Sequence, residues 1–166
     1  MYNGCSQAGP YTEDMVCPAN VYARHKLEME QRVLALRPDA VMLRATWMFD
    51  NRHGYLANLL RSGGTVTSVL QLRAVTWVQE AAEQIVRAME LPGGAYNYGS
   101  ENDLPMPELT SRALAMLRQN SLVVTGEPRR DLRINTVKAR AAGIHFSSSL
   151  EGIQRCIQSM REDTMS

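Results

Sequence analysis

The chain has 166 residues, of which 45% are hydrophobic and 21% are charged, and its formal net charge is +1. This composition is typical of a globular protein with one core, and the near-neutral charge argues against a nucleic-acid partner bound by bulk electrostatics. Its three cysteines lack the spacing of metal ligands, and no apolar run approaches the roughly 18 residues of a membrane helix. We therefore expect a cytoplasmic protein with free thiols and with no metal site, membrane segment or nucleic-acid partner.

The first part of the chain predicts a helix followed by a buried strand. Dipeptides that contain glycine or proline interrupt regular structure over residues 1–18. A helix is predicted over residues 19–36, and it ends because Pro38 steers the residue before it out of the helical region. The short apolar segment 40–45 then has the composition of a buried parallel strand. Helix followed by buried strand is half of a βαβ unit.

The middle of the chain predicts two further helices and two further strands. A short helix is expected over residues 54–62 and a strand over residues 65–72. Thr76, with Gln79 three residues later, has the pattern of a capping box at the start of the next helix. That helix has the cleanest amphipathic period in the chain, at Val78, Ala81, Ala82, Ile85, Val86 and Met89. Residues 95–98 follow as a short strand.

The last part predicts three helices and one strand. We expect a helix over 105–119, a short strand over 122–124, a basic loop over 127–133 and a short helix over 136–142. Ser148 and Glu151 form another capping-box pattern, which opens the last helix. Apolar faces are formed by Leu109, Ala113, Met116 and Leu117 in the first of these helices and by Leu150, Ile153, Ile157 and Met160 in the last. The alternation of helices and strands indicates an α/β fold.

Tyr22 and Lys26 form a Tyr-x-x-x-Lys pattern near the start of the first helix. Residues four apart on a helix share a face, so the phenol and the ammonium would project into the same space. A neighbouring cation favours the phenolate, which suits a tyrosine to proton transfer. By spacing alone, however, the commoner meaning of this pattern is a ring packed over a solvated lysine.

Three N-terminal segments carry a resemblance to a known family. Gly4 to Glu13, then Tyr22 and Lys26, then Leu43 to Phe49 resemble the dTDP-4-dehydrorhamnose reductase family of the extended short-chain dehydrogenases/reductases. In that family an acidic "pY.Ed" loop precedes the Tyr-x-x-x-Lys helix, and a strand ending "LRtsW.y" follows it.

The resemblance continues to about residue 157 in the family's order. Residues 73–81 look like its "G.PTyv.DlA" segment, residues 93–97 like its "GGvYn" strand, and residues 129–135 like its "RP.ns" loop. Val75 departs from the pattern, because the family usually has proline there.

The resemblance implies the C-terminal portion of a Rossmann-type parallel sheet with a smaller α/β substrate-binding lobe. Residues 1–50 and about 76–100 would form the Rossmann-like core, and residues about 51–75 and 101–160 the lobe, within a single incomplete domain of residues 1–166. Gly63-Gly64 and Gly93-Gly94 lack the G-x-G-x-x-G spacing of a dinucleotide-binding turn. The family's catalytic Ser or Thr would fall before Met1, so we expect the C-terminal part of a larger reductase.

The resemblance also implies an activity, NAD(P)H-dependent reduction of a 4-keto nucleotide-sugar in deoxysugar synthesis. Tyr22 would donate a proton to the carbonyl oxygen, and Lys26 would assist it and bind the nicotinamide ribose. The cofactor would be NADP or NAD, bound at a site that is incomplete in this chain. The substrate would be a nucleotide-sugar, and the partner a second copy of the chain or another subunit.

Further binding roles follow from the same resemblance. Trp47 would lie beside the sugar and the nicotinamide, although a core tryptophan is an equal alternative. Arg73, Arg129 and Arg130 would bind the substrate diphosphate, because guanidinium groups match phosphate oxygens. Without the resemblance, arginines in a loop would be interpreted as solvated surface charges.

Three alternative functions stay open at this point. An epimerase or dehydratase of nucleotide-sugars shares the Tyr-x-x-x-Lys pair. A non-catalytic regulator is the second, since the β subunit of methionine adenosyltransferase resembles the same family. The third is a truncated form with no activity of its own.

Overall fold

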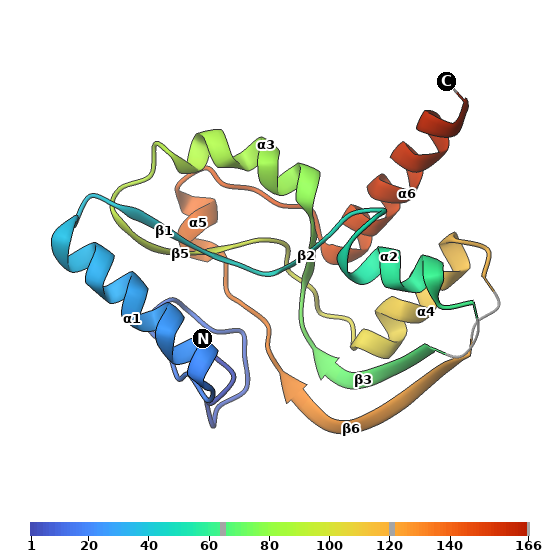
Figure 1. Cartoon of the computed structure of the whole chain (residues 1–166), viewed down its shortest axis with the longest axis horizontal. Helices are drawn as coiled ribbons and strands as arrows, with labels where there is room; N and C mark the ends of the chain where they lie inside the picture. Colours follow the sequence, from blue (N-terminus) through green and yellow to red (C-terminus); the bar gives the residue numbers. More distant parts are fainter. Residues whose placement is uncertain (64–65, 120–121, 166) are drawn as a thin grey trace.

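The computed structural model describes residues 1–63, 66–119 and 122–165, with the side chains of 125–129 and 163–165 left aside. Helices and strands alternate along the chain (Figure 1). The strands are β1 (Val41–Ala45), β2 (Trp47–Phe49), β3 (Val66–Leu72), β4 (Val75–Trp77), β5 (Gly94–Tyr98) and β6 (Val123–Asp131). The helices are α1 (Val21–Leu36), α2 (Gly54–Arg61), α3 (Val78–Ala88), α4 (Met106–Met116), α5 (Val137–Ala141) and α6 (Ser149–Met165). The predicted α/β class is therefore confirmed.

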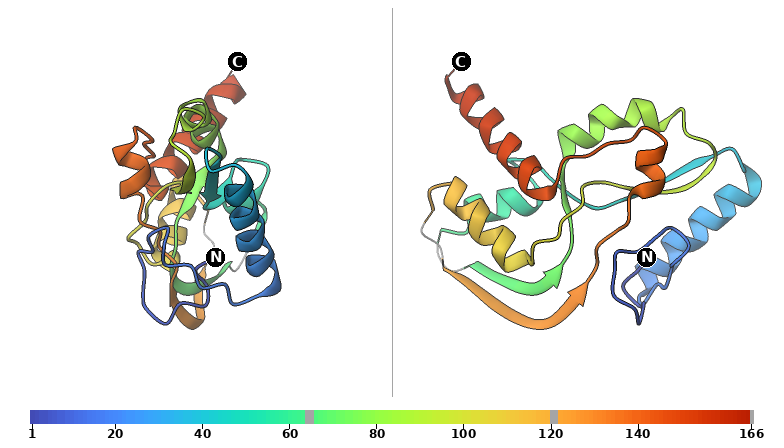
Figure 2. Two further views of the ribbon diagram at one scale, coloured as in Figure 1. Left: turned by 90° about the vertical axis from the view of Figure 1, so that its left-hand side faces the viewer. Right: turned by 180° about the vertical axis from the view of Figure 1, so that it is seen from behind.

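The strands of the first part form a parallel pair that lies between helices. β1 pairs with β5, with Val41 opposite Gly94 and Ala45 opposite Tyr98. α1 lies on one side of this pair and α5 on the other (Figure 2). Parallel strands covered on both faces are typical of α/β sheets, so the short apolar sequence of β1 was a sound guide to its position.

A second parallel pair, β2 with β4, continues where the first pair ends. The hydroxyl groups of Thr46 and Thr76 hydrogen-bond to each other, and the backbone N–H of Ser100 donates to Thr76 Oγ1 at 2.8 Å. Gly99 passes between them at φ +147, where a Cβ atom would lie 2.2 Å from Thr46 Oγ1. These contacts join the ends of β1, β4 and β5, and only glycine fits at the crossing.

The capping box predicted at Thr76 is wrong. Thr76 belongs to β4, α3 begins at Val78, and the residue that precedes it, Trp77, makes no side-chain cap. The Thr76 hydroxyl instead hydrogen-bonds to Thr46 Oγ1 and accepts from the N–H of Ser100, at the ends of the strands. The capping box predicted for α6 is found: Ser148 Oγ accepts from the N–H of Glu151 at 3.3 Å, and Glu151 Oε2 accepts from the N–H of Ser148 at 2.8 Å.

The third parallel pair, β3 with β6, corrects the predicted loop over residues 127–133. β6 runs through this basic segment as far as Asp131, which lies opposite Leu72. The register shifts between Val69 and Gln71, and Pro128 lies within the shifted part of β6. Proline is tolerated in a strand at such an irregularity, so the strand continues past the predicted end at residue 124. Thr65, the predicted first residue of β3, lies outside the described residues.

Two separate clusters of buried apolar side chains make up the core of the described residues. The larger cluster contains Phe49, Tyr55, Leu56, Leu59, Val75, Trp77, Met106, Leu109, Ala113, Leu114, Ile153, Cys156 and Ile157. The smaller cluster contains Ala81, Ala88, Leu91, Tyr96, Tyr98, Ala139 and Ile144. The larger one joins α2, α4 and α6 to β2 and β4, which confirms the apolar faces predicted for α4 and α6.

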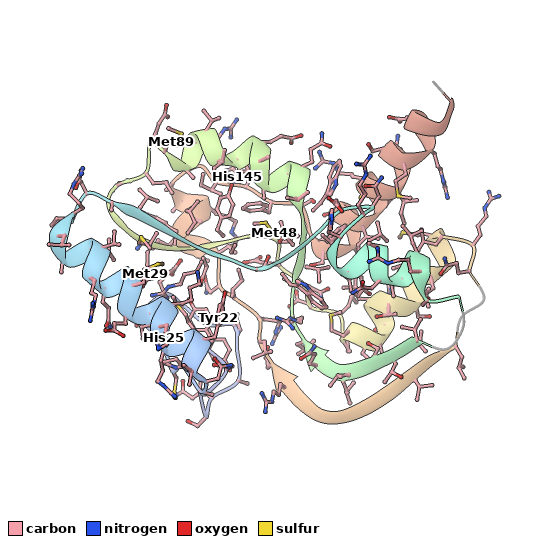
Figure 3. The ribbon with its side chains drawn as sticks, viewed as in Figure 1. Tyr22, His25, Met29, Met48, Met89 and His145 are labelled. Carbon is pink, nitrogen blue, oxygen red and sulfur yellow. The ribbon has the colours of Figure 1, made fainter. Side chains whose placement is uncertain are left out.

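The apolar face predicted for α3 is buried only in part. The helix packs through its small residues Ala81 and Ala88, which are buried, while Val86 and Met89 are 65% and 80% exposed. Glu80 anchors the same helix, because its carboxylate accepts from Ser147 and pairs with Arg155. The small side chains allow close approach, and the larger apolar ones stay exposed. Met89, just after the last residue of α3, is labelled in Figure 3.

A buried ion pair attaches α1 to β1. Arg44 donates to both carboxylate oxygens of Glu30, at 2.9 and 2.6 Å, and the two side chains are 9% and 5% exposed. Arg44 also donates to Tyr2 Oη at 2.8 Å and to the backbone carbonyl of Glu13 at 2.6 Å. Burial alone would lower the pKa of Arg44, but the hydrogen bonds with Glu30 and Tyr2 outweigh it and raise this pKa. The pair therefore fixes the helix that carries Tyr22.

Replacing Glu30 with glutamine should lower the free energy of unfolding by about 3 kcal/mol, because Arg44 would stay buried without its carboxylate. Urea denaturation followed by circular dichroism measures the effect. Glu28→Gln is the matched control on the same helix, since Glu28 pairs with Arg32 and the two side chains are 54% and 76% exposed. Its effect should stay below about 0.5 kcal/mol. Equal losses in the two variants would contradict the importance of the buried pair.

Candidate functional site

A cleft of about 440 Å³ opens between the N-terminal segment, α1 and the end of β1. Its described lining residues are Met1, Tyr2, Asn3, Tyr22, Ala23, Lys26, Met29, Glu30, Met42, Leu43, Arg44, Ala45, Thr46, Trp47, Arg73, Ala74, Leu132 and Ile134. Four of the side chains singled out from the sequence, Tyr22, Lys26, Trp47 and Arg73, thus border the same space although they come from three separate segments.

Tyr22 and Lys26 lie one turn apart on α1 and face this cleft. Asn20 caps the helix by accepting from the N–H of Ala23 at 2.8 Å, so the helix starts at Val21, one residue before Tyr22. Lys26 Nζ is 5.7 Å from the centroid of the Tyr22 ring, and Tyr22 is 71% exposed. Figure 3 shows Tyr22 near the N-terminal end of α1. The pair therefore presents a phenol and an ammonium to a common, open space.

Trp47 is a partly exposed wall of the cleft. It follows β1 by two residues and is the first residue of β2. Its side chain is 40% exposed, its ring meets the edge of Tyr55 at a centroid distance of 6.1 Å, and Arg73 lies over it. Trp77, at 7% exposure, is the core tryptophan of this chain. Trp47 thus occupies a place where a bound ring or sugar can contact it.

Arg73 enters the cleft from the turn between β3 and β4. Its Cζ atom is 5.1 Å from the centroid of the Trp47 ring. Burial lowers the pKa of Arg73. Among the described residues, no carboxylate pairs with this guanidinium group, so its N–H donors stay open toward the cleft.

Arg130, another predicted binding residue, does not line this cleft. Arg130 is exposed and borders a separate hollow that Leu72 and Pro105 also line. The side chain of Arg129 lies outside the described residues. Arg133, in the same basic segment, is already paired with Asp131 at 2.8 Å and with Asp103 at 2.7 Å. The structure therefore separates Arg73 from Arg130.

Sequence reasoning missed the polar network behind the cleft. Tyr2 Oη donates to Asn97 Oδ1 at 2.6 Å, and the fully buried Asn97 donates to the carbonyls of Tyr11 and Asn135 at 2.9 and 3.0 Å. The sequence did contain a signal of this network, namely Arg44 within the apolar segment 40–45. A buried arginine needs hydrogen-bond acceptors, and Tyr2 is one of those that Arg44 finds. Which of the distant carboxylates would meet Arg44 was not readable from the sequence.

Neither a metal cluster nor a membrane helix is found over residues 1–63, 66–119 and 122–165. No group of three histidine, cysteine or acidic side chains is placed to hold a metal ion there. No helix in that part of the chain is long and apolar enough to cross a membrane.

Comparison with known families decides the relationship. The family model described as "RmlD substrate binding domain" matches residues 2–130. The chain belongs to this family. The dTDP-4-dehydrorhamnose reductase resemblance drawn from the Tyr-x-x-x-Lys helix and its flanking segments is therefore confirmed.

Two curated relatives of this RmlD-type chain are named as reductases. A probable dTDP-4,6-dihydroxy-2-methyloxan-3-one 4-ketoreductase of Streptomyces antibioticus is 30% identical over 90 residues, which are 51% of this chain and 30% of that protein. A dTDP-4-dehydrorhamnose reductase of Mycolicibacterium smegmatis is 44% identical over 46 residues, 27% of this chain and 14% of that protein. The matched region is therefore less than a third of either relative.

Solved structures confirm the Rossmann-type fold. A dTDP-4-dehydrorhamnose reductase of Clostridium acetobutylicum has a TM-score of 0.84 at 16% identity, over 96% of this chain and 62% of that one. A dTDP-4-dehydrorhamnose reductase of Bacillus anthracis, solved in complex with NADP, has a TM-score of 0.75 at 18% identity, over 86% and 56%. The RmlD-type chain thus spans little more than half the length of these neighbours.

The Asp131–Arg133 contact gives a pH-dependent prediction. The hydrogen bond from Arg133 lowers the pKa of Asp131 in the folded chain. A carboxyl group whose pKa is lower when folded contributes stability above its unfolded pKa of about 3.9, and this contribution is lost as pH falls through the folded value. Asp131→Asn should therefore destabilise the chain by about 1 kcal/mol at neutral pH and by progressively less below about pH 4.

Urea unfolding at neutral and acidic pH measures this difference. Asp103→Asn is the matched control, because Asp103 pairs with the same Arg133 while its side chain is 89% exposed. Its effect at neutral pH should be smaller than that of Asp131→Asn. A gap between Asp131→Asn and the unmodified chain that persists at the most acidic pH would contradict the assigned cause.

Proposed function

We propose that this chain carries the proton donor and the substrate side of an NAD(P)H-dependent reductase of a 4-keto nucleotide-sugar. The observation that supports it most strongly is that Tyr22, Lys26 and Trp47 border one cleft in a chain of the RmlD substrate binding domain family. In this proposal the protein is cytoplasmic and its substrate is a nucleotide-sugar of the dTDP-4-dehydrorhamnose type.

Tyr22 acts as the general acid. Reduction of a carbonyl group leaves an alkoxide, and a positioned phenol protonates it faster than a proton from bulk water does. Lys26 Nζ lies 5.7 Å from the Tyr22 ring centroid, so its ammonium group is the cation next to the phenol that gives up the proton. Bound substrate also has to cover Tyr22, because the side chain is 71% exposed in the free chain.

Trp47 and Arg73 form the substrate side of the cleft. The exposed part of the indole offers a flat apolar surface for a sugar or nicotinamide ring. Arg73 supplies hydrogen-bond donors beside it. Arg129 and Arg130 are proposed to contact the nucleotide part of the substrate beyond this cleft, in keeping with the exposed position of Arg130.

The cofactor proposed for this site is NADP or NAD, whose reduced form supplies a hydride when it is bound. The ribose next to the nicotinamide is proposed to lie in this cleft, since Lys26 has no carboxylate partner among the described residues and can donate to ribose hydroxyl groups. Tyr22 would contact the same ribose, and Trp47 the ring beside it. The 166 residues contain no G-x-G-x-x-G turn for the pyrophosphate, so we expect NAD(P)H to bind this chain weakly.

The two buried clusters support a division into two lobes. We propose that residues 1–50 and about 76–100 form the Rossmann-like core and that residues about 51–75 and 101–160 form the substrate-binding lobe. The larger cluster falls in the second part, with Phe49, Val75 and Trp77 at the boundary. The smaller cluster also includes Ala139 and Ile144, which attach the α5 region to the core side.

In the protein that contains this chain, Tyr22→Phe should lower turnover by about 100-fold or more, because the general acid is lost. Binding of the nucleotide-sugar should change little, since the ring remains. Oxidation of NADPH in the presence of a 4-keto nucleotide-sugar, followed by absorbance, measures turnover, and calorimetry measures binding.

Arg24→Gln is the matched control, because Arg24 lies on the same helix and does not line the cleft. Unchanged turnover in Tyr22→Phe would remove Tyr22 from the mechanism. Binding of the nucleotide-sugar without any NADPH oxidation by the unmodified protein would favour the regulatory alternative. Formation of an epimer with no net loss of NADPH would favour the epimerase.

A further inference from the structure

Two of the three cysteines lie side by side in the N-terminal segment. The N–H of Gly4 donates to the carbonyl of Cys17 at 2.8 Å, and the N–H of Cys17 donates to the carbonyl of Met1 at 3.0 Å. These two hydrogen bonds hold the backbone next to Cys5 against the backbone of Cys17, although the loop 6–16 separates the two cysteines along the chain. Both are free thiols in this structure.

The two thiol groups are also in contact with each other. Burial raises the pKa of Cys5, and the charge of Cys17 and the hydrogen bond between the two side chains raise it further. The Cys5 thiol donates to the carbonyl of Met15 at 3.1 Å, which holds its sulfur atom within the loop. Gly4 makes this approach possible, because a Cβ atom there would lie 2.6 Å from the carbonyl oxygen of Cys17.

The cysteines of this chain differ in how easily a small molecule reaches them. Cys17 is exposed and Cys5 is half-buried. Cys156 is 3% exposed within the larger buried cluster, and burial raises the pKa of its thiol to about 11. Because the thiolate is the nucleophile in thiol exchange, access and burial decide which cysteine reacts. Cys17 is therefore the first thiol that a reagent in solution meets, and Cys5 is its neighbour.

We propose that Cys5 and Cys17 are a redox modification site, at which a small-molecule disulfide such as oxidised glutathione is exchanged for a disulfide within the chain. The contact between the two thiols and the exposure of Cys17 carry this proposal. It does not depend on the proposed reductase function, because neither Tyr22 nor Lys26 takes part. In a reducing compartment both cysteines stay thiols, and the disulfide forms when the glutathione pool becomes oxidised.

The reaction takes place in two exchange steps. The thiolate of Cys17 attacks one sulfur of oxidised glutathione, the glutathione S–S bond breaks, and one glutathione leaves as a thiolate. The thiolate of Cys5 then attacks the Cys17 sulfur of this mixed disulfide and releases the second glutathione. Two electrons pass from the cysteine sulfurs to glutathione, and the two cysteine protons end on the two released glutathione thiols.

The disulfide would fasten one wall of the cleft. Residues 1–3 line the cleft and directly precede this part of the chain, and Tyr2 accepts from Arg44 at 2.8 Å. A bond between Cys5 and Cys17 closes the loop between them and so removes conformational freedom from the unfolded chain. Oxidation therefore stabilises the segment that borders the cleft.

Peptide mapping of the whole chain tests the modification site. The folded chain is incubated with oxidised glutathione, and the remaining thiols are then alkylated in denaturant. A protease that cleaves after glutamate separates the two cysteines at Glu13. The peptides that carry Cys5 and Cys17 should stay joined until a reductant is added, and Cys156 should be recovered alkylated.

Two variants and the thermal unfolding of the chain complete the test. Cys5→Ser should stop at the mixed disulfide of Cys17 with one glutathione, because the second nucleophile is missing. Cys156→Ala is the matched control and should form the disulfide as the unmodified chain does. Oxidation should raise the midpoint of thermal unfolding of the unmodified chain by about 5–10 °C, and a reductant should reverse the shift. Cys5→Ser should show no such shift.

The outcomes that contradict the proposal are distinct from those that concern the reductase. Peptides that separate without a reductant, disulfides that include Cys156 as often as Cys5, or a mixed disulfide that persists on Cys17 of the unmodified chain would each overturn the modification site. An oxidised chain without the thermal shift would overturn the stabilising role of the disulfide. A Tyr22→Phe protein with full turnover would overturn the reductase mechanism and leave the thiol result standing.

Discussion

The buried contact between Arg44 and Glu30 is the interaction on which the candidate site depends. A guanidinium group is tolerated inside β1 because Glu30, Tyr2 and the carbonyl of Glu13 supply its acceptors. These partners come from α1 and from the N-terminal segment, so one side chain ties three parts of the chain together. The face of α1 that carries Tyr22 and Lys26 is set by this contact, since Ala23 and Glu30 are the buried residues of that helix.

The cleft combines side chains that differ in how firmly they are held. Trp47 is fixed by Tyr55 and Arg73, and Arg44 by its hydrogen bonds. Tyr22 and Lys26 are open to solvent on one side. The partly exposed indole of Trp47 thus lines the same cleft as the solvent-accessible pair of Tyr22 and Lys26. In the proposed mechanism, binding of the substrate would remove water from this pair.

The sequence was a good guide where local chemistry decided the structure. The capping box of Ser148 and Glu151 and the apolar faces of α4 and α6 follow from spacing alone, and the structure has them. The Tyr22–Lys26 spacing likewise placed both side chains on one helix face. The motif order along the chain was enough to identify the family, whose model matches residues 2–130.

The sequence was a poor guide where distant segments compete for the same atoms. The hydroxyl of Thr76 had the pattern of a helix cap, yet the strand ends at Thr46 and Ser100 use it. The basic residues of segment 127–133 suggested a loop, yet β6 pairs with β3 as far as Asp131. The partners of Arg44 and the stacking of Arg73 on Trp47 depend on tertiary packing, so neither has a signal in local spacing.

The separation of the two buried clusters has a consequence for the cleft. They share no residue among those described, and the hydroxyl pair of Thr46 and Thr76 lies where β1 and β5 give way to β2 and β4. Thr46, Trp47, Arg73 and Ala74 line the cleft at this junction. The cleft therefore lies where the two packing units meet. Its shape depends on the contacts that join them, among them the hydrogen bond between Thr46 and Thr76 and the ion pair of Glu80 with Arg155.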